Sequence, residues 1–144
     1  MPLKITLLDS LYSKAIKIRD DYTCQRCFNK FEPGPNPGLH LAHCFSRARQ
    51  LIRCFEDNAV ALCVHCHIWG KEGFPALDKN LPMKYRWFNK RLGAARFKKL
   101  KHMNDNPGRY QKPDKQELRD YYRAKIKEME SQRDGFIFGA RHGS

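Results

Sequence analysis

The chain has 144 residues, and its 28 Lys and Arg against 15 Asp and Glu give a formal net charge of +13 at pH 7. This length suits a single domain, residues 1–144, and a hydrophobic content of 41% excludes a disordered tail. So large a positive charge on a small surface favours a polyanionic partner, with nucleic acid before an anionic membrane. No apolar run approaches the ~20 residues of a membrane-spanning helix, so that class is excluded.

A helix is predicted near the N-terminus. Apolar residues recur on one face of residues 9–20, and Asp9 or Ser10 can cap such a helix. A tight turn of two cysteines follows, and the three prolines and two glycines of residues 31–38 predict an irregular loop.

The middle of the chain has the composition of short strands. Residues 39–45, LHLAHCF, indicate one strand, and residues 58–63, NAVALC, indicate a turn that enters another. Between them, the basic stretch 46–57 is expected to form a loop with a second strand. Residues 66–74, CHIWGKEGF, are expected to begin a helix or a turn.

The second half is predicted to be helical and basic. Residues 79–104 contain nine Lys or Arg and no acidic residue, with helix-compatible spacing that Gly93 weakens. Residues 114–132 predict a helix that begins with a capping box at 114–117. The helix carries an apolar stripe made of Leu118, Tyr122, Ile126 and Met129. The glycine-broken tail 135–144 carries no assignment.

The cysteines predict a metal site. Four of the six form two Cys-x-x-Cys pairs, Cys24, Cys27, Cys63 and Cys66. Two such turns can supply the four thiolates of a structural, tetrahedral zinc site. A redox dithiol is disfavoured because no βαβ pattern surrounds Cys24, and a chance spacing of buried thiols is the other alternative. Cys44 and Cys54 are expected to be small buried hydrophobes. With no secretory signal, the chain is expected in the reducing cytoplasm, where disulfides are rare.

Histidines lie between and beside the cysteine pairs. His40 and His43 fall on the first predicted strand, and His67 directly follows the last cysteine. Because the zinc turns would clamp the two ends of this region, the histidine-bearing strand is expected to lie near His67. His65, between two cysteines, is expected to be solvated.

This arrangement resembles a known family. The order His43, Asn58, His67 between two Cys-x-x-Cys pairs resembles the HNH endonucleases, which have a ββα-metal core. The string IRDDYTCQRC … LAHCFSRARQLIRCFEDNAVALCVHCH … LDKN resembles more narrowly the phage NinG/Rap recombination endonucleases, over residues of about 7–130. The resemblance implies an α+β fold: a small zinc-stapled ββα-metal (His-Me finger) core over residues 24–70, with flanking N- and C-terminal helices.

The resemblance also implies roles for single residues. His43 would be the general base, Asn58 would fix the loop beside the His43 strand, and His67 would bind a catalytic Mg²⁺ or Mn²⁺ next to the scissile phosphate. Many HNH proteins have a second metal ligand directly before the base, where this chain has Ala42. Positions 40 and 42 of an extended strand face the same side, so His40 is the candidate substitute. Without it, the metal would be held by one protein ligand and water.

Basic residues complete the predicted site. Arg47, Arg49 and Arg53 follow the histidine strand and are expected to clamp phosphates. Lys98, Lys99 and Lys101, within the basic segment 79–104, are expected to grip DNA arms.

The predicted function is a metal-dependent DNA endonuclease that cuts branched recombination intermediates, such as D-loops and four-way junctions. The resemblance implies phage-type recombination in the cytoplasm of a bacterial host, with 5′-phosphate and 3′-hydroxyl products. One alternative is a zinc module that binds nucleic acid without cutting it, and another is a nicking or restriction enzyme of the HNH type that reads sequence. Membrane binding is disfavoured. A homodimer is a further expectation, with the apolar stripe of 114–132 as its seam.

Overall fold

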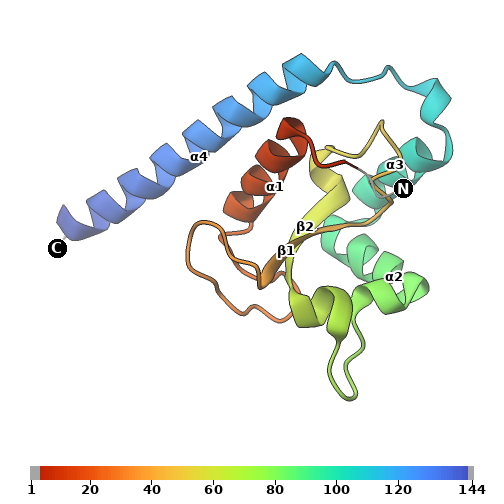
Figure 1. Cartoon of the computed structure of the whole chain (residues 1–144), viewed down its shortest axis with the longest axis horizontal. Helices are drawn as coiled ribbons and strands as arrows, with labels where there is room; N and C mark the ends of the chain where they lie inside the picture. The colour runs from red at the N-terminus through yellow and green to blue at the C-terminus, as the bar shows by residue number, and fades with distance from the viewer. Residues whose placement is uncertain (1–3, 143–144) are drawn as a thin grey trace.

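The chain is a mixture of helices around a small antiparallel sheet, so the predicted α+β class is confirmed. The structure is a computed structural model that describes residues 4–142, and the side chains of residues 4–134. Figure 1 shows the sheet in the middle, with helices on both sides. The helices and strands are, in chain order, α1 (Leu7–Arg19), β1 (Leu39–His43), β2 (Ala59–Cys63), α2 (Leu81–Leu92), α3 (Ala94–Asp105) and α4 (Lys115–His142).

Helix α1 begins two residues before its predicted start. Its N-cap is Thr6, whose hydroxyl accepts a hydrogen bond from the backbone of Asp9, and the Asp9 carboxylate accepts one from the backbone N–H of Thr6. The prediction that Asp9 or Ser10 caps this helix was therefore wrong, because Asp9 is the third helical residue of a capping box.

The two predicted strands pair in antiparallel register, with Leu39 opposite Cys63 and His43 opposite Ala59. β2 is buried along its whole length. Its side chains alternate between two apolar clusters. Val60 and Leu62 pack toward α2 and α3. Ala59 and Ala61 pack toward α1 and α4. The histidine strand β1 is thereby fixed against a core on both faces.

The connection between the strands contains no second strand, contrary to the prediction for 46–57. The buried side chain of Asn58 explains this. Its amide donates to the carbonyls of Phe45 and Ile52 and its oxygen accepts from the backbone N–H of Phe45. Asn58, at the end of the connection, is therefore hydrogen-bonded to Phe45 at its start and to Ile52 within it. The backbone of the connection forms turns and no strand.

After β2 the chain forms a short π-helix, His65–Trp69, which ends at Gly70 with a φ of +71°. A 3₁₀ turn, Leu77–Lys79, follows and leads into α2, which Asn80 caps by accepting a hydrogen bond from the backbone of Met83. This connection supplies one half of the candidate site.

The basic segment 79–104 forms two helices instead of one. The break falls at Gly93, whose φ of +89° lies in the region that favours glycine. Phe88 of α2 and Leu100 of α3 are both fully buried in the cluster beneath the sheet. The break lets both helices turn an apolar face to the same core.

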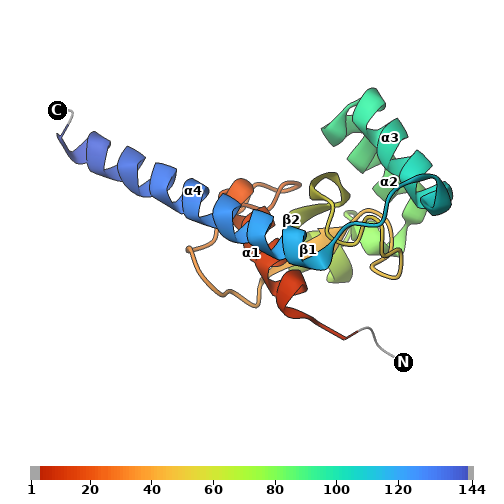
Figure 2. The same cartoon turned by 90° about the horizontal axis from the view of Figure 1, so that it is seen from above.

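Helix α4 begins as predicted, since the Asp114 carboxylate accepts a hydrogen bond from the backbone of Glu117 at 2.8 Å. It runs past the predicted end at residue 132, to His142. Figures 1 and 2 show it crossing over α1, with its C-terminal part extending past the rest of the chain. The Tyr122 hydroxyl donates to the Cys54 carbonyl at 2.6 Å. The apolar stripe packs on α1 of the same chain, so the structure argues against its use as a dimer seam.

Candidate metal centre and cleft

The four paired cysteines come together. One thiolate-capable sulfur from each of Cys24, Cys27, Cys63 and Cys66 lies within 4.8 Å of all the others. The Sγ atoms of Cys27 and Cys63 are 3.7 Å apart. In a tetrahedral site with Zn–S bonds of about 2.3 Å, neighbouring sulfurs are about 3.8 Å apart. The cluster therefore fits a structural metal such as zinc.

The backbone favours the thiolate form of one of these cysteines, Cys24, whereas burial raises the pKa of Cys27 and of Cys66 in the absence of a metal ion. Burial would raise the pKa of the Cys24 thiol, but hydrogen bonds from the backbone of Cys27, Cys63 and Arg26 lower it to about 7. Thiolates are the form that binds zinc. Cys44 and Cys54 are buried apart from the cluster, as predicted, and burial raises the pKa of each to about 12.

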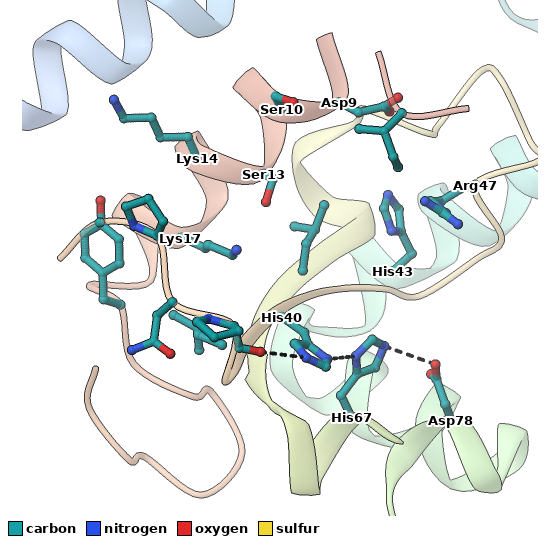
Figure 3. A pocket seen from close by; sticks show the side chains of 18 of the residues that line it. Asp9, Ser10, Ser13, Lys14, Lys17, His40, His43, Arg47, His67 and Asp78 are labelled. Carbon is teal, nitrogen blue, oxygen red and sulfur yellow. Dashed lines mark hydrogen bonds and ion pairs between the residues drawn. The ribbon is translucent and has the colours of Figure 1, made fainter. Parts of the chain in front are cut away.

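A cleft of about 1110 Å³ lies between α1, the loop of residues 34–37, β1 and the segments after β2. It brings together four residues that the sequence singled out, His40, His43, Arg47 and His67 (Figure 3).

His40 and His67 lie side by side in the lining of this cleft (Figure 3). Their Nδ1 atoms are 3.0 Å apart. The other ring nitrogen of His40, Nε2, lies 3.1 Å from the carbonyl oxygen of Pro37, and Nε2 of His67 lies 3.1 Å from a carboxylate oxygen of Asp78. An acceptor at Nε2 places the proton of a neutral imidazole there, which leaves Nδ1 as a lone pair. When both rings are neutral, the Nδ1 lone pairs of His40 and His67 therefore point toward one another.

Converging lone pairs suit a shared cation. Two imidazoles that bind one metal at about 2.1 Å, at right angles, have their nitrogens about 3.0 Å apart. The nitrogen that does not bind metal usually donates to a carbonyl or a carboxylate, as at Pro37 and Asp78 here. Ala42 is buried in the core and contributes no ligand, so the residues that could hold a catalytic metal are His40 and His67.

Asp78 orients this pair, and the sequence had not assigned it a role. Burial would raise the pKa of its carboxyl, but hydrogen bonds from His67 and Lys84 lower it to about 2. Its second oxygen is 3.0 Å from the Lys84 ammonium. Asp78 is thus an anion at neutral pH and can hold the Nε2 proton of His67.

His43 borders the same cleft with a fixed tautomer. Its Nε2 lies 2.9 Å from the carbonyl oxygen of Arg53, so Nε2 carries the proton of the neutral ring and Nδ1 is the lone pair. Burial lowers the pKa of His43 to about 4, against the smaller opposing effect of that hydrogen bond. The imidazole is therefore neutral at pH 7, with the lone pair of Nδ1 unprotonated.

The depressed pKa predicts that acid destabilises the fold. Between about pH 6.5 and pH 4 the unfolded chain carries a proton on residue 43 that the folded chain lacks, so the free energy of unfolding falls as the pH falls through this range. The full difference corresponds to ~3 kcal/mol. Denaturant titrations at pH 7 and pH 4.5 measure it, and His43→Gln should show a smaller loss. Equal losses in both proteins would contradict a buried, neutral His43.

The three arginines differ in their surroundings. Arg47 borders the cleft, and Arg49 is exposed outside its lining. Arg53 is buried, and its guanidinium binds the Asp9 carboxylate at 2.7 Å and the Lys4 carbonyl at 2.8 Å. Its Nε and Nη2 donors are engaged inside the fold, so the geometry speaks against a phosphate clamp at Arg53.

The predicted lysines of α3 lie outside the lining of the cleft. Lys98 and Lys99 are exposed, and Lys101 pairs with Asp105 at 2.6 Å. Asn58 is also outside the lining. Its side chain forms hydrogen bonds with the backbone of the connection between the two strands.

Sequence reasoning missed Lys17 and Lys84, which border the cleft, as well as Asp78. A signal existed for Asp78, because LDKN was part of the pattern that resembled the nuclease family. Lys17 carried none, since it is one of several basic residues on α1.

The chain matches no family model, no curated protein and no solved structure. Among the described residues, no helix has the length and apolar character needed to cross a membrane. Function is therefore inferred from the side chains of the cleft.

Proposed function

We propose that this protein is a metal-dependent DNA endonuclease of the HNH type. The observation that carries the proposal is the convergence of the His40 and His67 Nδ1 atoms, at 3.0 Å, in a cleft that His43 also borders. A module that only binds DNA has no need for two converging metal ligands beside a neutral histidine with a fixed tautomer. Hydrolysis of a phosphodiester needs both a cation and a base.

Each residue has a defined part in this chemistry. His40 and His67 would hold a divalent ion, whose charge would offset that of the phosphate and the leaving oxygen. The Nδ1 atom of His43 accepts the proton of the attacking water. The Arg53 carbonyl keeps the opposite nitrogen protonated, and Asp78 does the same for His67. Asn58 holds the connection that follows His43.

The proposed substrate is branched DNA of phage-type recombination. Phosphate contacts carry no sequence information, so a basic surface selects DNA by shape. The exposed Lys98 and Lys99 and the cleft residue Arg47 are the proposed backbone contacts. One observation favours a different candidate, a zinc module that binds nucleic acid without cutting it: Ala42 stands where many HNH proteins have a metal ligand.

Cleavage assays separate these candidates. The zinc-loaded protein is incubated with linear, flap, D-loop and four-way-junction DNA, with and without added Mg²⁺ or Mn²⁺. We expect cleavage of branched substrates only with the added ion. Absence of cleavage from every reaction overturns the nuclease, and cleavage of one linear sequence without cutting branches favours a sequence-reading enzyme.

Substitutions then test whether His40 and His67 bind one metal ion together. His67→Ala is expected to lose cleavage, and His40→Ala and Asp78→Asn to raise the half-saturating Mn²⁺ concentration by about 10–100-fold. His102→Ala is the matched control, because His102 is exposed on α3 and bonds Tyr110 outside the cleft. An unchanged Mn²⁺ dependence in both His40→Ala and Asp78→Asn would contradict the pair.

A further inference from the structure

One face of α1 forms a wall of the cleft. Ser10, Ser13 and Lys17 recur at helical spacing and border the cleft, while Tyr12 and Ile16 point into the core. Figure 3 shows the Lys17 side chain reaching from α1 toward the side of the cleft that holds the His40–His67 pair.

The carboxylates that border the cleft are already engaged. Asp9 pairs with Arg53 at 2.7 Å. Asp78 lies 3.1 Å from His67 and 3.0 Å from Lys84. Neither is left to neutralise a further cation inside the cleft.

The basic residues of the cleft divide into paired and unpaired ones. The Lys14 ammonium lies 3.2 Å from the Glu130 carboxylate of α4. Within residues 4–134, Lys17 and Arg47 have no carboxylate at salt-bridge distance. They are therefore the cleft cations that can accept an external anion.

Lys17 is half-buried, and burial lowers the pKa of its ammonium. Removing a charged ammonium from water without a partner is unfavourable, and an anion in the cleft would offset that cost. Lys17, His40 and His67 line the same cleft, and Figure 3 shows all three side chains in it. An anion bound at Lys17 would therefore lie in the cleft that holds His40 and His67.

We propose that Lys17 binds a non-bridging phosphate oxygen of the DNA backbone. The cleaved strand then runs between α1 and the His40–His67 pair. Ser13 lies farther along the same helix face and offers a hydroxyl donor to the neighbouring phosphate, whereas the Ser10 hydroxyl donates to the Thr6 carbonyl. This inference rests on the proposed nuclease function, and it adds helix α1 as one side of the path that the DNA strand follows.

Binding measurements test Lys17 separately from cleavage. Fluorescence anisotropy of a labelled four-way junction, without added divalent metal, is recorded against salt for the parent, Lys17→Gln, Lys17→Arg and Lys14→Gln. The last is the matched control: it removes the same charge one turn away, from a lysine held by Glu130. We expect Lys17→Gln to weaken binding about tenfold and to reduce the salt slope by about 1, as for one lost phosphate contact. Lys17→Arg should bind like the parent, and Lys14→Gln should change less than Lys17→Gln.

The outcomes separate the two proposals. A Lys17→Gln protein that matches the parent in affinity and salt slope, or loses no more than Lys14→Gln, overturns the phosphate site, even if the parent cleaves DNA. A parent that binds no DNA overturns it as well. The expected loss in a parent that binds but never cleaves supports the phosphate site and removes the nuclease.

Discussion

Cleavage by His43→Ala is expected to fall by about 10²–10⁴-fold, the usual cost of losing a general base. The affinity for DNA should stay near that of the parent, since a neutral imidazole with a pKa of about 4 adds no charge to the cleft at pH 7. Single-turnover cleavage with saturating Mn²⁺ and anisotropy on the same junction give both quantities. His102→Ala is again the control.

Two results would contradict the assignment of His43. Near-normal cleavage by folded His43→Ala would remove the HNH-type mechanism. If the variant lost much of its DNA affinity but still cleaved bound DNA at nearly the parent rate, His43 would be a substrate contact and not the base. Circular dichroism of the variant is needed first, because the Tyr12 ring packs against His43 with ring centroids 5.8 Å apart.

Replacing Cys24 by serine is expected to remove zinc and to destabilise the fold by several kcal/mol. Structural zinc sites in small zinc fingers contribute apparent binding free energies of about 10–16 kcal/mol. That range is as large as the net stability of a typical domain, about 5–15 kcal/mol. The cluster joins the turn after α1 to the end of β2 and to the π-helix. Loss of the ion should therefore loosen all three segments.

Zinc content by mass spectrometry under native conditions and the melting temperature measure this effect together. Cys44→Ala is the matched control, because Cys44 is equally buried but lies outside the cluster. It should keep the zinc and lose only the modest stability of a small core truncation. A Cys24→Ser protein with full zinc and the melting temperature of the parent would refute the structural site.

The parts of this fold that the sequence predicts are local. Cys-x-x-Cys spacing predicts a thiolate turn without knowledge of the rest of the chain. The N-cap at Asp114 and the composition of NAVALC are local in the same sense; the cap and the strand are confirmed, and the second half of the predicted capping box, from Glu117, is not seen among the hydrogen bonds of the described residues. The pair of His40 and His67 was within reach because His40 lies between the two cysteine pairs and His67 directly follows the second.

The failures at the candidate site concern the partners of charged side chains. Arg53 follows the histidine strand closely, but its partner is Asp9, far earlier in the chain. The basic segment has no acidic residue of its own, yet Arg91 pairs with Asp20 and Arg96 with Asp57, both far earlier in the chain. Pairing across the fold depends on tertiary packing, which residue spacing does not report. The direction in which Lys17 points was hidden for the same reason.

The packing of α4 on α1 has a consequence for how the chain folds during synthesis. The Tyr12 and Tyr122 rings are 5.4 Å apart, although 109 residues separate them in the chain. Everything between must be made before α1 is covered, whereas the cysteines of the metal cluster all lie within residues 24–66. Contacts between distant residues also form slowly, because a long loop has to close first. On the ribosome the zinc-bound centre can form early, and the N-terminal helix keeps an uncovered apolar face until the last helix emerges.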